Sequence, residues 1–170
     1  MRRAVVLLFA LQAALASALD APNVVTISPR LVTSGQPSVK SLASLREEGF
    51  TAVVYLVPTT AQDAVPQEAE ILREQGIEHV KVPIHWQQPT EADYAAFSAA
   101  MKRVPNGKVL VHCQINLQAS TMTFLYRVIE LGESPDKAYE SVASVWSPNE
   151  VWKRYVVAQL ARAKIAFEPY

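Results

Sequence analysis

The most reactive side chain in this sequence belongs to its only cysteine, Cys113. It directly follows the apolar run 108–112, which is predicted to be a central strand buried on both faces, and a helix is predicted from about Ala119. In an open α/β sheet, a loop between a central strand and a helix points backbone N–H groups and the positive end of the helix dipole at one spot. This loop is therefore predicted to bind an anion and to lower the pKa of the Cys113 thiol, which makes it a nucleophile. An inert, buried thiol is the alternative.

The residues around Cys113 are candidates for supporting roles. His112 lies on the opposite face of the strand from its neighbours, so it is expected to hold the loop rather than to react. Ser120 is a candidate to donate its hydroxyl to the sulfur or to assist the later departure of the sulfur. The sequence predicts no metal ligand and no cofactor. The predicted anion-binding loop comprises Cys113, Gln114, Ile115, Asn116, Leu117, Gln118 and Ala119.

The elements that must position this loop alternate between short β-branched runs and helical stretches, which is the order of an α/β fold. We therefore expect a mostly parallel sheet of four or five strands that is flanked by helices, with an all-helical C-terminal third. The predicted strands are 24–27, 31–33, 51–57, 78–82 and 108–112. The predicted helices are 38–48, 66–76, one that begins near residue 90, 119–131, and one after each of the Ser-Pro pairs at 134 and 147.

The first 18 residues are predicted to be a secretory signal peptide. Arg2 and Arg3 precede the uncharged run 4–15, and residues 16–18 have the small-x-small pattern that signal peptidase reads. The apolar run is shorter than the roughly 20 residues that a membrane-spanning helix needs. We expect residues 19–170 to form a single domain that is periplasmic or secreted, with no membrane span after cleavage.

The charge composition excludes one class of partner. Sixteen Lys and Arg side chains balance sixteen Asp and Glu side chains. Nucleic-acid binding depends on a positive field that neutralises phosphates. Nucleic acid is therefore not an expected partner.

The run 111–120 begins Val-His-Cys and has an asparagine three residues after the cysteine. It resembles the phosphate-binding loop of the cysteine-dependent protein tyrosine and dual-specificity phosphatases. Within that superfamily, the sequence is similar to a bacterial branch related to the phosphatase-like domain of beta-lactamase hydrolase-like proteins, which the segments 28–37 and 124–127 also resemble. The resemblance implies the phosphatase-like fold and a reaction in which the Cys113 thiolate attacks phosphorus to form a phosphocysteine, which water then hydrolyses. It implies a phosphate-bearing small molecule or a phosphoprotein as the partner.

The loop departs from this family pattern at one position. The branch has an arginine five residues after the cysteine, where this sequence has Gln118, and Ala119 occupies the spacing that the wider superfamily uses. An arginine grips two phosphate oxygens with a charged fork, whereas a glutamine offers one neutral NH₂ group. Arg127 follows nine residues later on the next helix and is expected to pair with a surface carboxylate instead.

The general acid is also displaced from its expected place. Phosphatases of this kind use an aspartate on a separate loop to protonate the leaving oxygen. Asp93 is the nearest candidate, although its spacing from Thr90 predicts a capping box. His85 and Glu91 are weaker candidates, and Asp63 is placed either at the mouth of the site or in solvent.

Three classes of function remain open on these residues. The missing loop arginine favours a pseudophosphatase that binds an oxyanion or a partner protein. The alternative is an active phosphomonoester hydrolase that works through Cys113 and backbone donors. A rhodanese-like or redox protein is the weakest of the three, because no second cysteine is present.

Overall fold

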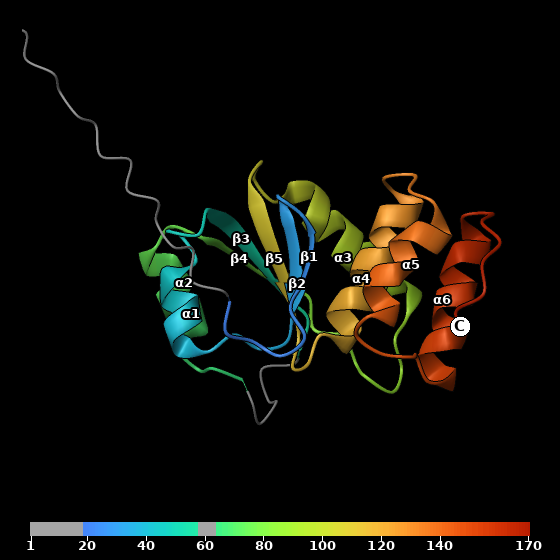
Figure 1. Cartoon of the computed structure of the whole chain (residues 1–170), viewed down its shortest axis with the longest axis horizontal. Helices are drawn as coiled ribbons and strands as arrows, with labels where there is room; N and C mark the ends of the chain where they lie inside the picture. The colour runs from blue at the N-terminus through green and yellow to red at the C-terminus, as the bar shows by residue number, and fades with distance from the viewer. Residues whose placement is uncertain (1–18, 58–63) are drawn as a thin grey trace, which may run out of the picture.

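The computed structural model describes residues 19–57 and 64–170 (Figure 1). The predicted signal peptide, 1–18, and Asp63 lie outside the described residues. Within the described ranges, no helix is both long enough and apolar enough to cross a membrane.

Five strands form one sheet with a central strand that leads into the predicted anion-binding loop. The order across the sheet is β1-β2-β5-β3-β4, in which β1 is antiparallel to β2 and every other neighbouring pair is parallel. β5 therefore lies in the middle of the sheet, and Cys113 follows its carboxyl end. The strands are β1 (Val25–Ser28), β2 (Leu31–Ser34), β3 (Phe50–Tyr55), β4 (Glu78–Lys81) and β5 (Lys108–His112).

Helices cover both faces of this sheet. Figure 1 shows α1 and α2 on one side and α3 to α6 on the other, with the last three helices forming the C-terminal part. The predicted α/β class, the mostly parallel sheet and the helical C-terminal third are therefore confirmed. The helices are α1 (Val39–Ser44), α2 (Glu68–Glu74), α3 (Glu91–Arg103), α4 (Leu117–Ile129), α5 (Pro135–Ala143) and α6 (Glu150–Arg162).

The apolar strands supply a separate core to each layer of helices. Val53 of β3 and Leu110 of β5 pack with Leu42 and Leu72 beneath α1 and α2. Val54 belongs to the larger core on the other face, which contains the apolar sides of α3 to α6. Successive strand residues point to opposite faces, so strands buried on both sides read as unbroken apolar runs.

Candidate functional site

The loop after β5 surrounds the Cys113 sulfur with backbone donors. The side chain is 2% exposed. The backbone N–H groups of Ile115, Asn116, Gln118 and Ala119 form hydrogen bonds to it. Asn116 has a left-handed backbone, with φ 71°, and this turn sends the chain into α4. Four backbone N–H groups at the start of α4 thus converge on the sulfur.

The helix after the loop starts two residues earlier than the sequence predicts. α4 begins at Leu117 rather than at Ala119. The left-handed residue Asn116 makes the turn within the loop, so Leu117 and Gln118 are already helical. As a result, two of the four donors to the sulfur come from the first turn of α4.

Burial has a larger effect on Cys113 than these donors have. Burial raises the pKa of the Cys113 thiol, and hydrogen bonds from the loop N–H groups only partly oppose this rise. The expectation of a lowered pKa is therefore wrong in direction. That expectation rests on the position of the thiol alone. For a buried sulfur, desolvation raises the pKa by more than hydrogen bonds from neutral donors lower it. The loop 113–119 itself carries no positively charged side chain.

A cavity of about 290 Å³ opens over the sulfur. Its walls include two apolar side chains that are partly exposed, Trp86 at 37% and Ile115 at 49%. A site of this kind combines a polar base of N–H groups with apolar sides. It fits an oxyanion attached to a flat or apolar body. The lining residues are Trp86, Cys113, Gln114, Ile115, Leu117 and Gln118.

The side chain of Gln118 takes part in a contact that the sequence does not predict. It is buried, and its Nε2 donates to the carbonyl oxygen of Ile84 at 3.0 Å. Gln118 thus joins the loop after β5 to the segment 84–90. Its amide is used in this contact.

Two side chains of α6 hold the same segment in place. Trp152 Nε1 donates to the carbonyl oxygen of Trp86 at 3.1 Å, and the hydroxyl of Tyr155 donates to that of Thr90 at 3.0 Å. The Trp86 ring also lies 5.4 Å from the Trp152 ring and 5.5 Å from the Trp146 ring, between centroids. The cavity wall formed by Trp86 is therefore fixed by the C-terminal helix.

The candidate acids lie outside this cavity. Asp93 forms the predicted capping box, in which its Oδ2 accepts from the Thr90 N–H at 2.6 Å and from the Thr90 hydroxyl at 2.8 Å. Glu91 forms an ion pair with Arg162 at 3.1 Å. His85 lines a different groove, between the segment 84–90 and α6. Trp86 is the residue of this segment that lines the cavity.

His112 faces away from the cavity toward α2. Its Nε2 lies 2.8 Å from the Oε1 of Glu68, which is 4% exposed, and the other carboxylate oxygen of Glu68 accepts from Gln36 at 2.8 Å. Burial acts to raise the pKa of Glu68, but the hydrogen bonds and charge of His112 and the hydrogen bond from Gln36 outweigh it, so the pKa is lowered. Sequence reasoning missed Glu68 because it reads as an ordinary acid in the first turn of a helix.

Ser120 and Arg127 stabilise the helices around the loop. The Ser120 hydroxyl is buried and donates to the carbonyl oxygen of Leu117 at 3.2 Å, within α4, rather than to the sulfur. Arg127 pairs with the carboxylate of Glu133, as predicted, at distances from 2.7 to 3.2 Å. It is 7% exposed and also donates to the carbonyl oxygen of Ala138, so it lies beneath the surface rather than on it.

The amino-terminal segment supports the loop from the other side. The side chain of Asn116 donates to the carbonyl oxygen of Asn23 and to the hydroxyl of Thr33. Gly35 pairs with Ile115 in an isolated β-bridge. A Cβ at Gly35 would lie 2.7 Å from the carbonyl oxygen of Gln114. Only glycine fits this approach without a shift of the backbone. In the described ranges, no three His, Cys, Asp or Glu side chains gather to hold a metal ion.

Two curated bacterial relatives share part of this sequence, although no family model matches the chain. The beta-lactamase hydrolase-like protein of Xylella fastidiosa is 31% identical over 111 residues, which cover 64% of this chain and 26% of that protein. Its counterpart in Agrobacterium fabrum is 28% identical over 109 residues, which cover 62% of this chain and 25% of that protein. The chain spans about a quarter of the length of the curated relatives that it matches.

Solved structures with the same fold include phosphatases. A DUF442 protein from Shewanella putrefaciens CN-32, described as a candidate phosphatase, has a TM-score of 0.76 and 28% identity, over 84% of this chain and 92% of that chain. TpbA of P. aeruginosa in complex with pTyr has a TM-score of 0.61 and 21% identity, over 80% of this chain and 81% of that chain, which shows a shared fold. The predicted resemblance to the protein tyrosine phosphatase-like superfamily and to beta-lactamase hydrolase-like proteins is therefore confirmed.

Proposed function

We propose that the Cys113 cavity binds an oxyanion carried on an aromatic or other apolar body, and that the protein is a pseudophosphatase whose turnover is weak or lost. The observation that carries this proposal is the contact of Gln118. The side chain in the place of the expected arginine lines the cavity, is neutral, and donates to the carbonyl oxygen of Ile84. The loop keeps its ring of N–H donors without a charged fork.

The walls of the cavity support an aryl ligand. Trp86 and Ile115 present apolar surface directly beside the N–H ring. Aromatic ligands stack on tryptophan faces with a gain beyond the area that they bury. TpbA, which has this fold, is known in complex with pTyr. An aryl phosphate or phosphonate is therefore the probe of choice for this chain.

Two further observations support weak or lost turnover. Burial raises the pKa of Cys113, so little thiolate is present at neutral pH to attack phosphorus. Asp93 is engaged in the capping box with Thr90, outside the cavity. An efficient phosphatase requires an ionised nucleophile and an acid that reaches the leaving group, and neither is present in this arrangement.

The alternative is an active phosphomonoester hydrolase, which the intact N–H ring favours. In that reaction the Cys113 thiolate forms a bond to phosphorus while the bond from phosphorus to the leaving oxygen breaks, and that oxygen keeps the electron pair and takes a proton from water. Water then attacks the phosphocysteine and releases phosphate and the thiolate. Backbone donors alone stabilise oxyanions, and each typically contributes about 10²–10³ in rate.

Two measurements distinguish the pseudophosphatase from the active hydrolase. One is calorimetric titration with phenylphosphonate, which cannot be hydrolysed, and the other is an assay with p-nitrophenyl phosphate. We expect phenylphosphonate to bind, and hydrolysis to be slow and to vanish in Cys113→Ser. Ile115→Glu places a negative charge at the cavity and is expected to weaken binding at least about tenfold. Leu131→Glu is the matched control, because Leu131 is similarly exposed, at 55% against 49% for Ile115, but does not line the cavity. Efficient Cys113-dependent hydrolysis would establish the alternative, and an absence of phenylphosphonate binding would exclude the proposal.

A further inference from the structure

A cavity of about 320 Å³ lies between α2 and the carboxyl ends of β3 and β4, and it shares no lining residue with the Cys113 cavity. Tyr55 and Lys81 are register partners at the ends of these two strands, and both line the cavity. Its volume falls at the lower end of the range of small-molecule sites in proteins. Glu68 and His79 complete the polar part of the wall, and Ala64, Val65, Pro66 and Ala69 form the apolar part.

Two buried polar atoms in the wall of this cavity form no hydrogen bond with the described residues. Tyr55 is 5% exposed, and its hydroxyl has no partner. His79 Nε2 lies 3.4 Å from Glu68 Oε1 and is also without a hydrogen bond. Buried polar groups are nearly always hydrogen-bonded. Two unpaired polar atoms in the wall of one cavity therefore indicate a partner that occupies it.

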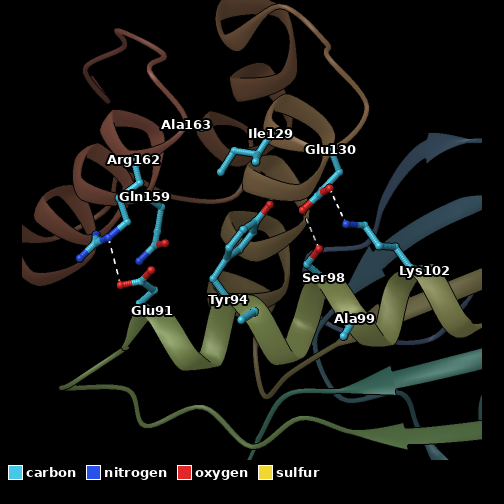
Figure 2. Close-up of a pocket in the computed structure, with 11 residues that line it drawn as sticks. Glu91, Tyr94, Ser98, Ala99, Lys102, Ile129, Glu130, Gln159, Arg162 and Ala163 are labelled. Carbon is cyan, nitrogen blue, oxygen red and sulfur yellow. Dashed lines mark hydrogen bonds and ion pairs between the residues drawn. The ribbon is translucent and has the colours of Figure 1, made fainter.

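The larger groove on α3, which Figure 2 shows, lacks this feature. Its two carboxylates are paired, Glu130 with Lys102 at 2.6 Å and Glu91 with Arg162 at 3.1 Å. The Ser98 hydroxyl also donates to Glu130, at 2.7 Å. The charged groups of that groove thus pair with one another, so the groove on α3 gives no sign of a ligand.

The unpaired groups beside α2 can all donate a hydrogen bond, so they fit a ligand that accepts. Burial raises the pKa of Tyr55, so its hydroxyl keeps its proton at neutral pH. Burial lowers the pKa of His79, so its imidazole is neutral there, and in one tautomer Nε2 is the donor. Lys81 is exposed, forms no ion pair with the described residues, and has an ammonium group that can only donate.

Glu68 limits the charge that such a ligand can carry. One oxygen of its carboxylate lies 2.8 Å from His112 Nε2, and the other accepts from Gln36 at 2.8 Å. Glu68 is therefore already paired, but it places a negative charge in the wall of the cavity. Like charges repel more strongly where burial lowers the dielectric constant. A single negative charge on the Lys81 side is therefore favoured over the double charge of a phosphate monoester.

We propose that this cavity binds a small aliphatic monocarboxylate. The carboxylate accepts hydrogen bonds from the hydroxyl of Tyr55 and from the ammonium group of Lys81, with His79 Nε2 as a third donor. The short tail lies against the apolar side chains of Val65 and Pro66 in the same wall. This site is separate from the Cys113 cavity and does not depend on the function proposed for it.

Titration with butyrate, followed by amide NMR spectra at neutral pH and fixed ionic strength, tests this proposal. We expect butyrate to shift the amides of α2 and of the carboxyl ends of β3 and β4. Butylamine and 1-butanol, which have the same chain length, are expected to leave these amides unchanged. Equal shifts with all three probes would overturn the proposal, because they would show that the cavity takes up any apolar chain. No shift with any probe would overturn it as well, because water would then be the partner of Tyr55 and His79.

Tyr55→Phe distinguishes an effect on binding from an effect on folding. The variant loses only a hydroxyl that has no partner among the described residues, so the free energy of unfolding should not fall. Its affinity for butyrate should fall at least about tenfold, the effect of a hydrogen bond to a charged group. Lower stability with unchanged affinity would show that the hydroxyl serves the fold, and it would exclude the site.

Lys81→Gln removes the positive charge of the cavity and is expected to lower the affinity for butyrate about two- to fivefold, the range of an ion pair at the surface. Lys137→Gln is the matched control, since Lys137 is an exposed lysine of α5 that does not line the cavity. An equal loss of affinity in both variants would contradict a specific contact with Lys81. The phenylphosphonate titration reports on the Cys113 cavity, so this proposal and the proposed function fail independently.

Discussion

At the scale of single residues, the sulfur of Cys113 has many donors around it and no charged neighbour from its own loop. Backbone N–H groups of the loop form hydrogen bonds to it, yet burial controls its ionisation. Gln118, at the position where an arginine would give the loop a positive charge, donates a hydrogen bond to the carbonyl oxygen of Ile84. The chemistry of the loop thus depends on these two side chains, and each of them can be tested by itself.

The reactivity of Cys113 with iodoacetamide should rise only at alkaline pH. Because burial raises the pKa of the thiol, the thiolate fraction at pH 7 is smaller than for a free cysteine. We expect the midpoint of the alkylation rate against pH to lie above about 8.5, the value of a free thiol. Vanadate should slow the reaction if it occupies the N–H ring. A midpoint below the free value would show that the loop donors outweigh burial.

Gln118→Arg should restore hydrolysis of an aryl phosphate. An arginine places two N–H donors and a full positive charge beside the equatorial oxygens, where charge develops in the transition state. We expect kcat/KM for p-nitrophenyl phosphate to rise at least about 10²-fold, with most of the gain in kcat. An aryl leaving group departs with little help from an acid, so the position of Asp93 does not mask the result.

The control for this variant is the double change Gln118→Arg with Cys113→Ser, which must be inactive. The substitution also removes the hydrogen bond from Gln118 to Ile84, which is one of the hydrogen bonds that hold the segment 84–90 in place. If the variant binds phenylphosphonate but stays inactive, the missing charge is not the sole reason for weak turnover.

At the scale of elements, the carboxylate of Glu68 connects α2 to the central strand. It contacts His112 at the end of β5 and accepts from Gln36, so the strand, the helix and the amino-terminal segment meet at one buried group. His79 of β4 lies 3.4 Å from the same carboxylate. Because His112 directly precedes Cys113, this cluster supports the start of the loop from the face opposite the cavity.

Glu68→Gln should destabilise the protein at neutral pH and have little effect at acid pH. The pKa of Glu68 is lower in the folded chain than its ordinary value, so its charge contributes stability above that value, and this contribution is lost as the pH falls through the folded pKa. We expect a loss of about 1–3 kcal/mol in the free energy of unfolding at pH 7, as for a weakened buried hydrogen-bond network. Urea unfolding of both proteins at pH 7 and pH 3 measures the difference. An equal loss at both values would assign the effect to packing instead of charge.

The elements themselves could be predicted from the sequence, because their apolar periods and turn residues are local. The loop after β5 can be located for the same reason, since a buried strand followed by a helix is visible in a short window of sequence. Glu68 could not be found in this way, because its partner His112 is 44 residues further along the chain. The direction of the pKa of Cys113 also depends on how deeply the whole fold buries it, which no local pattern contains.

At the scale of the whole molecule, the C-terminal helix α6 positions one wall of the Cys113 cavity. Trp152 and Tyr155 of α6 hold the segment that carries Trp86, which lines this cavity. Residues far apart in sequence are thus required for one site. The contact between Trp152 and Trp86 spans 66 residues, so neither tryptophan shows its role in the sequence alone.

We further propose that the chain acts outside the cytoplasm, and its mature form should begin at Leu19. Residues 1–18 have the charged start, the short apolar run and the small-x-small end of a signal peptide. Intact-mass measurement of the natively expressed protein should show the loss of these 18 residues. A full-length product retained in the membrane would contradict both the cleavage and the periplasmic or secreted location.

The aromatic cluster beside the Cys113 cavity also determines which part of the protein its tryptophan fluorescence reports on. The chain has three tryptophans, and Trp86, Trp146 and Trp152 all lie in that cluster, with ring centroids 5.4 to 6.4 Å apart. Its intrinsic tryptophan fluorescence therefore comes from one place in the molecule. Opening of the segment 84–90, or an aryl group settling against Trp86, should alter the emission of the whole chain, whereas fraying of α1 or α2 should leave it unchanged. An unfolding curve recorded by emission would thus follow the wall of the cavity, and circular dichroism would follow the backbone as a whole.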